Sequence, residues 1–304
     1  MQKVLIICGP TATGKTSLAL KIAKILGGAS ILSADSRQIY TGLDIVSGKD
    51  IPKDLDSSIR FFGINLFKPN QIANLSEYVG YARKVLKEEI SENHPVIIVG
   101  GTGLYLKGLT EELSDIGVPN DLDLRDRLSS LSTASLQDEL KKLDQNKFDS
   151  LNNSDKNNPR RLIRYIEIAS NGDHKKILTS LPDVEFVWIG LSPRANLAEL
   201  IKDRVVERIS HGAVDEVKKL LKNYPDTGLP IYSSLGVKEL ITFIDNKISD
   251  VDMIDLWTRS EINYSKRQMV WFKKQPNIIW YDESTDPKDL ALKLAKIIKP
   301  NEQK

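Results

Sequence analysis

Short apolar runs alternate with longer amphipathic segments along most of the chain. The segments between the runs carry apolar residues at helical spacing, as in residues 76–90, and the runs themselves have the length and composition of strands. The six runs lie at residues 4–8, 30–33, 61–66, 96–99, 186–191 and 278–281. Strands that alternate with helices predict an α/β fold with a parallel sheet covered by helices on both faces.

One long segment interrupts this alternation. Residues 113–182 contain no convincing strand and are rich in Leu, Asp, Lys and Asn. We interpret them as a helical insertion domain in a core that comprises residues 1–112 and 183–304, the latter part including the C-terminal helices. Ligands in such folds bind beyond the carboxyl ends of the strands, so an insertion at that edge is placed to cover the site like a lid.

Composition adds few constraints. The 304 residues are 40% hydrophobic and 28% charged, as in an ordinary globular protein, and the net charge of +2 neither requires nor excludes a polyanionic partner. The single cysteine excludes internal disulfides, and the three histidines lack the spacing of a transition-metal site. No apolar run approaches the roughly 20 residues that a bilayer requires, so we expect a cytoplasmic protein with no membrane contact. Without a long heptad repeat, we expect a monomer.

Residues 9–16 read GPTATGKT, which is a complete phosphate-binding loop between an apolar strand and an expected helix at 17–26. The two glycines let the backbone curl with its N–H groups inward, and the helix presents its positive N-terminal end to the anion. Lys15 adds a charge against the phosphates, and the Thr16 hydroxyl is placed to ligate Mg²⁺. The expected diphosphate- or triphosphate-binding residues are Gly9, Pro10, Thr11, Ala12, Thr13, Gly14, Lys15 and Thr16.

Two further segments follow strands at the same sheet edge. Residues 33–40 read SADSRQIY, which places Asp35 where a carboxylate can ligate a metal, bind a substrate hydroxyl, take a proton or cap a helix. Residues 96–105 read VIIVGGTGLY, so glycines stand where an ATP-hydrolysing enzyme normally carries an acid. We interpret residues 100–103 as a pocket wall to which Thr102 adds a hydroxyl.

Two basic clusters lie in the second half of the chain. NPRRLIRYIEI begins at residue 158, and YSKRQMVWFKK, which mixes cations with aromatic residues, begins at residue 264. Phosphate contacts and stacking surfaces suit a looped RNA, but amphipathic helices that bury aromatics and expose cations explain either cluster equally well. Arg204 and Arg208, four apart on a helix beginning near Leu197, either reach a diphosphate or are solvated.

In this order, GPTATGKT, SADSRQIYTGLDI, IIVGGTGLYLKGL, NPRRLIRYIEI and YSKRQMVWFKK resemble the motifs of the tRNA dimethylallyltransferases, also called tRNA isopentenyltransferases. The resemblance covers nearly the whole chain and implies a P-loop NTPase-like sheet flanked by helices. It implies transfer of a dimethylallyl group from dimethylallyl diphosphate to N6 of the adenosine at position 37, 3′-adjacent to the anticodon, in tRNAs that read codons beginning with U. The implied products are N6-dimethylallyladenosine and diphosphate, and the implied partner is the tRNA anticodon stem-loop.

Two other functions remain open from the residues themselves. In a P-loop small-molecule kinase, the same loop would hold ATP and Asp35 would orient an acceptor hydroxyl, but the basic clusters would have no task. A non-catalytic RNA-binding module would use those clusters but not the phosphate loop.

The resemblance also implies a role for individual residues. Asp35 accepts the proton from N6, Lys15 and Arg204 neutralise the departing pyrophosphate, Thr16 ligates Mg²⁺, and Thr102 lies near the adenine and the donor. The insertion is the mobile helical domain that closes on the RNA. The implied tRNA contacts are Asp35, Ser36, Arg37, Gln38, Thr102, Arg125, Arg160, Arg161, Arg164, Lys238, Lys266, Arg267 and Gln268.

Three segments depart from the family pattern. Leu235-Gly236-Val237-Lys238 stands where a Gly-Tyr-Arg stretch is common, and Phe61-Phe62-Gly63 stands where a histidine pair is usual. Ser47-Gly48-Lys49 replaces the more usual Gly-Thr-Ala-Lys. None of these includes Asp35 or the phosphate loop, so they concern substrate range and RNA affinity and not reaction class.

Overall fold

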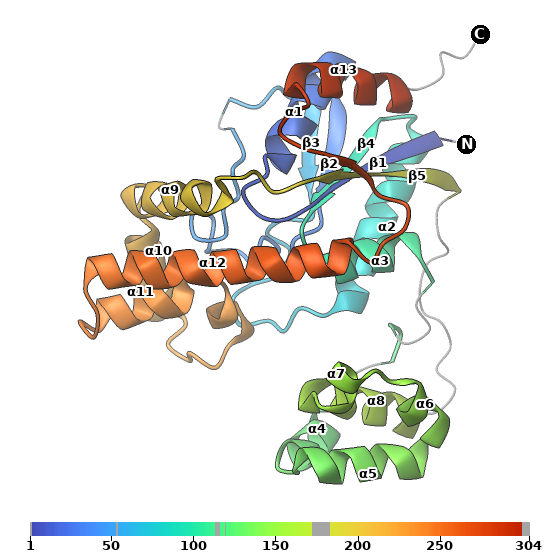
Figure 1. The fold of residues 1–304 in the computed structure, drawn as a ribbon, viewed down its shortest axis with the longest axis vertical. Helices are drawn as coiled ribbons and strands as arrows, with labels where there is room; N and C mark the ends of the chain where they lie inside the picture. Colours follow the sequence, from blue (N-terminus) through green and yellow to red (C-terminus); the bar gives the residue numbers. More distant parts are fainter. Residues whose placement is uncertain (1, 53, 113–115, 119, 172–182, 300–304) are drawn as a thin grey trace. The chain divides into compact units, whose positions relative to one another are not determined.

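The computed structural model describes residues 2–52, 54–112, 116–118, 120–171 and 183–299 and contains a six-stranded parallel sheet (Figure 1). The strand order is β3-β2-β4-β1-β5-β6, and every neighbouring pair is parallel. The strands are β1 (Gln2–Cys8), β2 (Ala29–Ser33), β3 (Ile59–Phe62), β4 (Val96–Gly100), β5 (Val184–Leu191) and β6 (Ile279–Tyr281). The α/β prediction is therefore confirmed.

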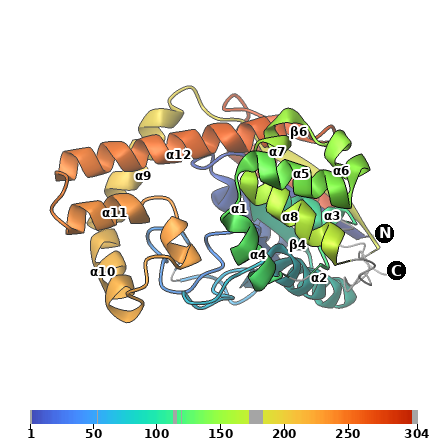
Figure 2. The same ribbon diagram turned by 90° about the horizontal axis from the view of Figure 1, so that it is seen from below.

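Helices pack around the sheet and extend from its carboxyl edge. In Figure 2, α9, α10 and α11 gather at one end of the long α12. None of the described helices combines the length and apolar character needed to cross a membrane. The helices around the sheet are α1 (Lys15–Leu26), α2 (Leu75–Ser91), α3 (Gly103–Thr110), α9 (Leu197–Ser210), α10 (Ala213–Asn223), η1 (Pro230–Ser233), α11 (Val237–Ile244), α12 (Asp250–Phe272) and α13 (Pro287–Ile298).

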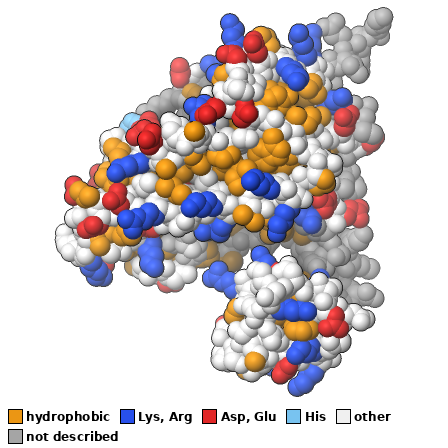
Figure 3. Space-filling model, in the orientation of Figure 1, with side chains coloured by type: hydrophobic (Ala, Val, Ile, Leu, Met, Phe, Trp, Pro, Cys, Tyr) orange, Lys and Arg blue, Asp and Glu red, His pale blue; other side chains and the backbone are white. Residues whose placement is uncertain are grey.

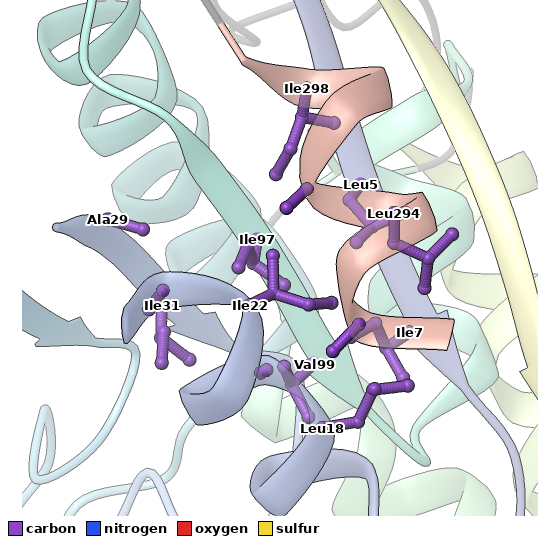
Figure 4. Packing of buried hydrophobic residues seen from close by; sticks show 14 of the residues in the cluster. Leu5, Ile7, Leu18, Ile22, Ala29, Ile31, Ile97, Val99, Leu294 and Ile298 are labelled. Atoms are coloured by element: carbon purple, nitrogen blue, oxygen red, sulfur yellow. The ribbon is translucent and has the colours of Figure 1, made fainter. Parts of the chain in front are cut away.

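The core between the sheet, α1 and α13 follows from two patterns in the sequence, the alternation of side chains along the strands and the helical spacing of apolar residues in the helices. Alternate strand residues point to the same face, so Leu5 and Ile7 of β1 lie beside Ile97 of β4. Ile22 of α1 and Leu294 of α13 pack on them, and all five side chains are fully buried (Figure 4). Burying each such side chain contributes roughly 1.5–3 kcal/mol relative to exposure.

The third strand differs from the predicted position at residues 61–66. It spans Ile59–Phe62 and ends at Gly63, whose φ is +78°, and Asn65 also has a left-handed backbone with φ +55°. A side chain at Gly63 would overlap the carbonyl oxygen of Ser33. Ile64 and Leu66 therefore lie outside the strand, and the apolar pattern alone did not reveal the two left-handed residues that follow it.

The position of β4 determines which loops meet at the carboxyl edge of the sheet. β4 pairs with both β1 and β2, with Cys8 opposite Gly100 and Ser33 opposite Val99. The phosphate loop after β1, the Asp35 segment after β2 and the glycine turn after β4 therefore start from three adjacent strands.

The chain divides into two compact units, one of residues 1–111 with 179–304 and the other of residues 112–178. The second unit is helical in its described residues and has its own core, which includes Leu128, Leu140 and Leu162. The ends of the predicted insertion, at residues 113–115, 119 and 172–182, lie outside the described residues. Its helices are α4 (Leu122–Ser129), α5 (Thr133–Leu143), α6 (Gln145–Ser150), α7 (Asn153–Lys156) and α8 (Pro159–Ser170).

A buried carboxylate ties α4 to α8 in this second unit. The fully buried Glu167 accepts hydrogen bonds from Arg125 Nε and Nη2, both at 2.9 Å, from Arg164 Nη1 at 2.5 Å and from the Asp121 N–H at 2.6 Å. Burial acts to raise the pKa of Glu167, but these hydrogen bonds outweigh it, so the net pKa is lowered.

We predict that Glu167→Gln destabilises the second unit by about 3–5 kcal/mol, because it leaves two guanidinium groups without their buried counter-charge. A carboxyl group with a lowered folded-state pKa stabilises the fold above its unfolded pKa, and this contribution is lost as the pH falls through the folded pKa. In the full chain, the α4 and α8 amides of the variant should exchange hydrogen faster than those of wild type at neutral pH. At acid pH, where the carboxylate of wild type is protonated, the two proteins should exchange at similar rates.

Glu139→Gln provides the matched control, because Glu139 pairs with Arg127 at 3.3 Å on a partly exposed surface. Its effect should stay below about 1 kcal/mol. Equal effects of the two substitutions would contradict the assigned importance of Glu167.

Candidate active site

The phosphate loop joins β1 to α1 and has a backbone that requires glycine. Gly9 has φ +136°, and Gly14, which precedes α1, has φ +83°. A Cβ atom at Gly9 would lie 2.5 Å from the carbonyl oxygen of Leu191, so no side chain fits there. The Thr13 hydroxyl closes the loop by donating to the carbonyl oxygen of Pro10 at 2.9 Å. The loop thus curls ahead of the N-terminus of α1, which is the end of a helix that attracts anions.

Lys15 is the half-buried cation of this loop. Its Nζ donates to the carbonyl oxygen of Pro10 at 2.6 Å. Burial lowers the pKa of Lys15 from 10.5 to about 8; the Asp35 carboxylate opposes this shift, and the Arg204 guanidinium adds to it. A bound anion would favour the charged form, so phosphate binding and protonation of Lys15 are coupled.

Asp35 follows β2 directly and is held by a local turn. Its Oδ1 accepts the Arg37 N–H at 2.9 Å, an Asx turn that fixes the carboxyl group. No described residue donates a hydrogen bond to its Oδ2, and the side chain lines the cavity. Residues 36–39 form a turn and no helix, so the alternative of Asp35 as a helix cap is wrong.

The neighbours of Asp35 are fixed by the adjoining loops. The Ser36 N–H donates to Thr102 Oγ1 at 3.0 Å, and Gln38 Nε2 donates to the carbonyl oxygen of Gly48 at 3.0 Å. Arg37 Nη1 donates to the Ser233 hydroxyl at 3.0 Å. The structure therefore brings Asp35, Ser36 and Thr102 together, as the sequence predicted.

Because the residues after β4 are glycines, their backbone packs closely against the backbone of one neighbouring segment and a side chain of another. A side chain at Gly100 would overlap the carbonyl oxygen of Ala34, and one at Gly101 would overlap the amide of Gln268. Gly100 and Gly101 line the cavity, which confirms the predicted wall for these two residues, whereas Gly103 packs against the Trp271 ring.

Gln268, which the resemblance implies as a tRNA contact, is buried in the structure. It is 6% exposed, its Nε2 donates to the carbonyl oxygen of Gly101 at 3.1 Å, and its Oε1 accepts the Thr11 N–H at 2.9 Å. The residue lies at the cavity wall and braces the phosphate loop against the glycine turn. Its place within a run of cations concealed this role, because helical spacing puts Tyr264 and Gln268 on the inner face of α12 and Lys266 on the opposite face.

The two arginines of α9 lie beside the phosphate loop. Arg204 pairs through Nη2 with Asp50 at 2.8 Å and donates through Nη1 to the Thr11 hydroxyl at 3.4 Å. Arg208 pairs with the buried Glu261 at 2.9 Å, and its own side chain is only 12% exposed. Arg204 is therefore placed at the loop as predicted, and the solvated alternative is wrong for Arg208.

These segments enclose one cavity of about 680 Å³ within the first unit. This size suits a small-molecule ligand. Thr102 lies behind the wall, where it contacts Ser36 and Tyr264, instead of lining the cavity. Among the predicted site residues, the lining includes Thr11, Ala12, Gly14, Lys15, Thr16, Asp35, Arg37, Gln38, Arg204 and Gln268.

Tyr264 and Asp50 are cavity residues that the sequence interpretation did not assign. Burial raises the pKa of the Tyr264 hydroxyl to about 12, and the Asp35 carboxylate adds to the shift, so the phenol stays neutral. The four-residue spacing from Tyr264 to Gln268 was the available signal for a shared inner face. Asp50 had no such signal, since its contact with Arg204 spans 154 positions.

The remaining predicted RNA contacts of the first unit lie on the surface. Lys238, Lys266 and Arg267 are exposed, and the Arg267 guanidinium stacks 5.6 Å from the Tyr264 ring. Figure 3 shows basic side chains interspersed with apolar ones over α12.

The four predicted arginines of the second unit are not equivalent. Arg125 and Arg164 bind the buried Glu167, and Arg161 pairs with Asp155. Arg160 is exposed and forms no ion pair with any residue that the structure describes. Arg160 is thus the cation of this group most accessible to an external phosphate.

Comparisons with known proteins agree with this arrangement. A family model described as IPP transferase matches residues 38–275. The chain is 34% identical to the tRNA dimethylallyltransferase of Ligilactobacillus salivarius and 32% identical to that of Prochlorococcus marinus, and each match covers 98% of both chains. The solved full-length tRNA isopentenylpyrophosphate transferase of Bacillus halodurans superposes with a TM-score of 0.71 at 28% identity, covering 98% of this chain and 96% of that one.

We predict that Lys15 titrates in the free protein with a midpoint near pH 8, well below the usual 10.5, because burial desolvates its ammonium group. NMR of its ¹³Cε resonance measures this directly. Asp35→Asn should lower the midpoint further, since it removes the carboxylate that favours the ammonium. A midpoint at the usual lysine value would contradict the buried environment.

Proposed function

Because the chain belongs to the IPP transferase family, we propose that it transfers a dimethylallyl group from dimethylallyl diphosphate to N6 of adenosine 37, next to the anticodon, in tRNAs that read codons beginning with U. The observation that carries the proposal is the joint placement of a phosphate loop and the Asp35 carboxylate on one cavity wall. The strand between them, β4, ends in glycines and not in an acid that would activate water.

The donor diphosphate occupies the loop of residues 9–16 in this proposal. Backbone N–H groups and the N-terminus of α1 meet its oxygens, while Lys15 and Arg204 supply positive charge. Arg204 keeps its pair with Asp50 through Nη2 and offers Nη1, which already reaches Thr11, to the incoming phosphate. These groups stabilise the charge that grows on the leaving diphosphate as the allylic C–O bond breaks.

The residues at the loop fit a magnesium ion that is bound mainly through the diphosphate. Thr16 lines the cavity at the start of α1, and the described residues contain no cluster of three His, Cys, Asp or Glu side chains that could form a metal cage. Mg²⁺ commonly binds substrate phosphates with few protein ligands, so the Thr16 hydroxyl suits it. The ion would supply further charge to the departing diphosphate.

Asp35 receives the proton when N6 attacks the allylic carbon. The exocyclic amine is a poor nucleophile, and an adenine in a stacked loop must be turned out to reach the cavity, at a cost of a few kcal/mol. The Asx turn holds the carboxylate in place, and its Oδ2 is available as the acceptor. Thr102 and Ser36 support the same segment from behind the cavity wall.

RNA contacts are proposed on both units. Arg37, Gln38, Lys238, Lys266 and Arg267 are assigned to the first unit, with Gln268 acting as a brace behind them. The insertion, residues 113–182, contributes Arg160 and Arg161 directly, while Arg125 and Arg164 act through the fold that Glu167 holds together. We further propose that the protein acts on tRNA as a monomer in the cytoplasm.

The transfer reaction can be tested with dimethylallyl diphosphate, Mg²⁺ and an anticodon stem-loop that carries the target adenosine. We predict that the RNA gains the mass of one dimethylallyl group and that Asp35→Asn lowers the rate by about 10²–10⁴ through loss of the general base. Stem-loop affinity should stay nearly unchanged in this variant, which preserves the shape of the side chain.

A parallel reaction with ATP and small acceptors distinguishes the kinase alternative. Consumption of ATP without any RNA requirement, and no mass gain on the stem-loop, would refute prenyl transfer. Unchanged turnover by Asp35→Asn would refute the assigned base alone.

For RNA binding, we predict that Arg160→Ala weakens stem-loop affinity and reduces the slope of log K against log salt by about 1, because one phosphate contact is lost. Arg127→Ala is the matched control, since Arg127 is an exposed arginine of the same unit that pairs with Glu139. Fluorescence anisotropy at several salt concentrations measures both. An identical slope for wild type and Arg160→Ala would exclude the proposed contact.

A further inference from the structure

One loop of the cavity mouth has no regular secondary structure of its own. Residues 43–51, here called the mouth loop, lie between β2 and β3, and Val46, Ser47, Gly48, Lys49, Asp50 and Ile51 line the cavity. Loops without a ladder of backbone hydrogen bonds need other partners for their N–H groups. Those partners decide whether the loop is ordered before a ligand arrives.

Carbonyl oxygens within the loop accept the N–H groups of residues 47–49, and a carboxylate from a distant helix accepts the three N–H groups before them. Glu216, in the first turn of α10, accepts the N–H groups of Asp44 at 2.6 Å and Ile45 at 2.9 Å through Oε1, and that of Val46 at 2.8 Å through Oε2. Both carboxylate oxygens are therefore committed to three consecutive N–H groups. Hydrogen bonds to a charged acceptor are roughly twice as strong as neutral ones.

A second anchor lies within the loop itself. The Lys49 side chain is 3% exposed, and its Nζ donates to the carbonyl oxygen of Tyr40, to Asp44 Oδ1 and to Asn65 Oδ1, each at 2.6 Å. All three ammonium protons are thus used, so Lys49 stabilises the loop and does not bind a phosphate. Asp44 joins the two anchors, since its N–H binds Glu216 and its carboxylate binds Lys49.

The mouth loop in turn contacts the arginines of α9. Gly48 has φ +63°, and a side chain there would overlap the Arg208 guanidinium. Asp50 pairs with Arg204 at 2.8 Å. The position of the loop therefore sets where these guanidinium groups stand relative to the phosphate loop.

We propose that Glu216 is a positioning residue for the diphosphate site: it holds the mouth loop in place, so that Asp50 keeps Arg204 preorganised to meet the anion. The proposal rests on the proposed function for the identity of the anion. Glu216 acts through the loop and touches neither substrate. Without its carboxylate, three N–H groups turn to water, and each ligand that binds must order the loop again, which weakens affinity.

The test compares Glu216→Gln with Asp215→Asn in the full chain. Asp215 is the adjacent exposed acid in the same helical turn, so its substitution removes the same charge from the N-terminus of α10 without touching the mouth loop. We expect Glu216→Gln alone to accelerate hydrogen exchange of the residue 44–46 amides and to weaken binding of inorganic pyrophosphate about tenfold by calorimetry.

In the transfer assay, Glu216→Gln should raise the KM for dimethylallyl diphosphate by a similar factor while kcat stays close to wild type, since the bound ligand restores the ordered loop. Glu216→Asp keeps the charge on a shorter side chain and should give an intermediate KM. It also keeps the test decisive if Glu216→Gln folds poorly.

Two results would overturn the assignment. One is faster amide exchange with unchanged pyrophosphate affinity and KM, and the other is an equal effect of Asp215→Asn. If Glu216→Gln weakens pyrophosphate binding but wild type transfers no dimethylallyl group to RNA, the anchor stands and the proposed function fails.

Discussion

Parallel pairing of β4 with both β1 and β2 is the constraint on which the site depends. Because the carboxyl ends of adjacent parallel strands lie side by side, this pairing delivers the phosphate loop, the Asp35 turn and the glycine turn to one edge. Gly100 and Gly101 then let these loops approach until backbone meets backbone. Gln268 completes the arrangement from α12, because its side-chain amide accepts the Thr11 N–H of one loop and donates to the carbonyl oxygen of Gly101 in another. Four segments far apart in the sequence thus share a single cavity.

The sequence revealed those features that depend on local spacing. The phosphate loop, the strands and the position of Asp35 all follow from patterns within about ten residues, and each was found correctly apart from the displaced third strand. The turn at Gly63 and Asn65 was missed because left-handed residues interrupt an apolar run without changing its composition. Contacts such as that of Asp50 with Arg204 could not be predicted from the sequence, because pairing across 154 positions leaves no periodic signal.

The roles of the arginines in the second unit and in α9 could not be predicted from the sequence for a similar reason. An arginine in a sequence carries the same charge whether it serves the fold or a ligand. In the structure, Arg125 and Arg164 neutralise a buried carboxylate, Arg208 neutralises another, and Arg160 faces solvent. The division follows the partners that folding provides, because a buried carboxylate demands a cation at short range. Composition and helical spacing specify the cations but not those partners.

The mouth loop has a consequence for how such a site can diversify. Its shape is set by main-chain N–H groups bound to Glu216 and by the caged ammonium of Lys49. The side chains that it turns toward the cavity, among them Ser47 and Ile51, contribute to neither anchor. Apart from Lys49, which belongs to both sets, the residues that line the cavity are distinct from the groups that anchor the loop, so replacing Ser47 or Ile51 would change the cavity surface and leave both anchors in place.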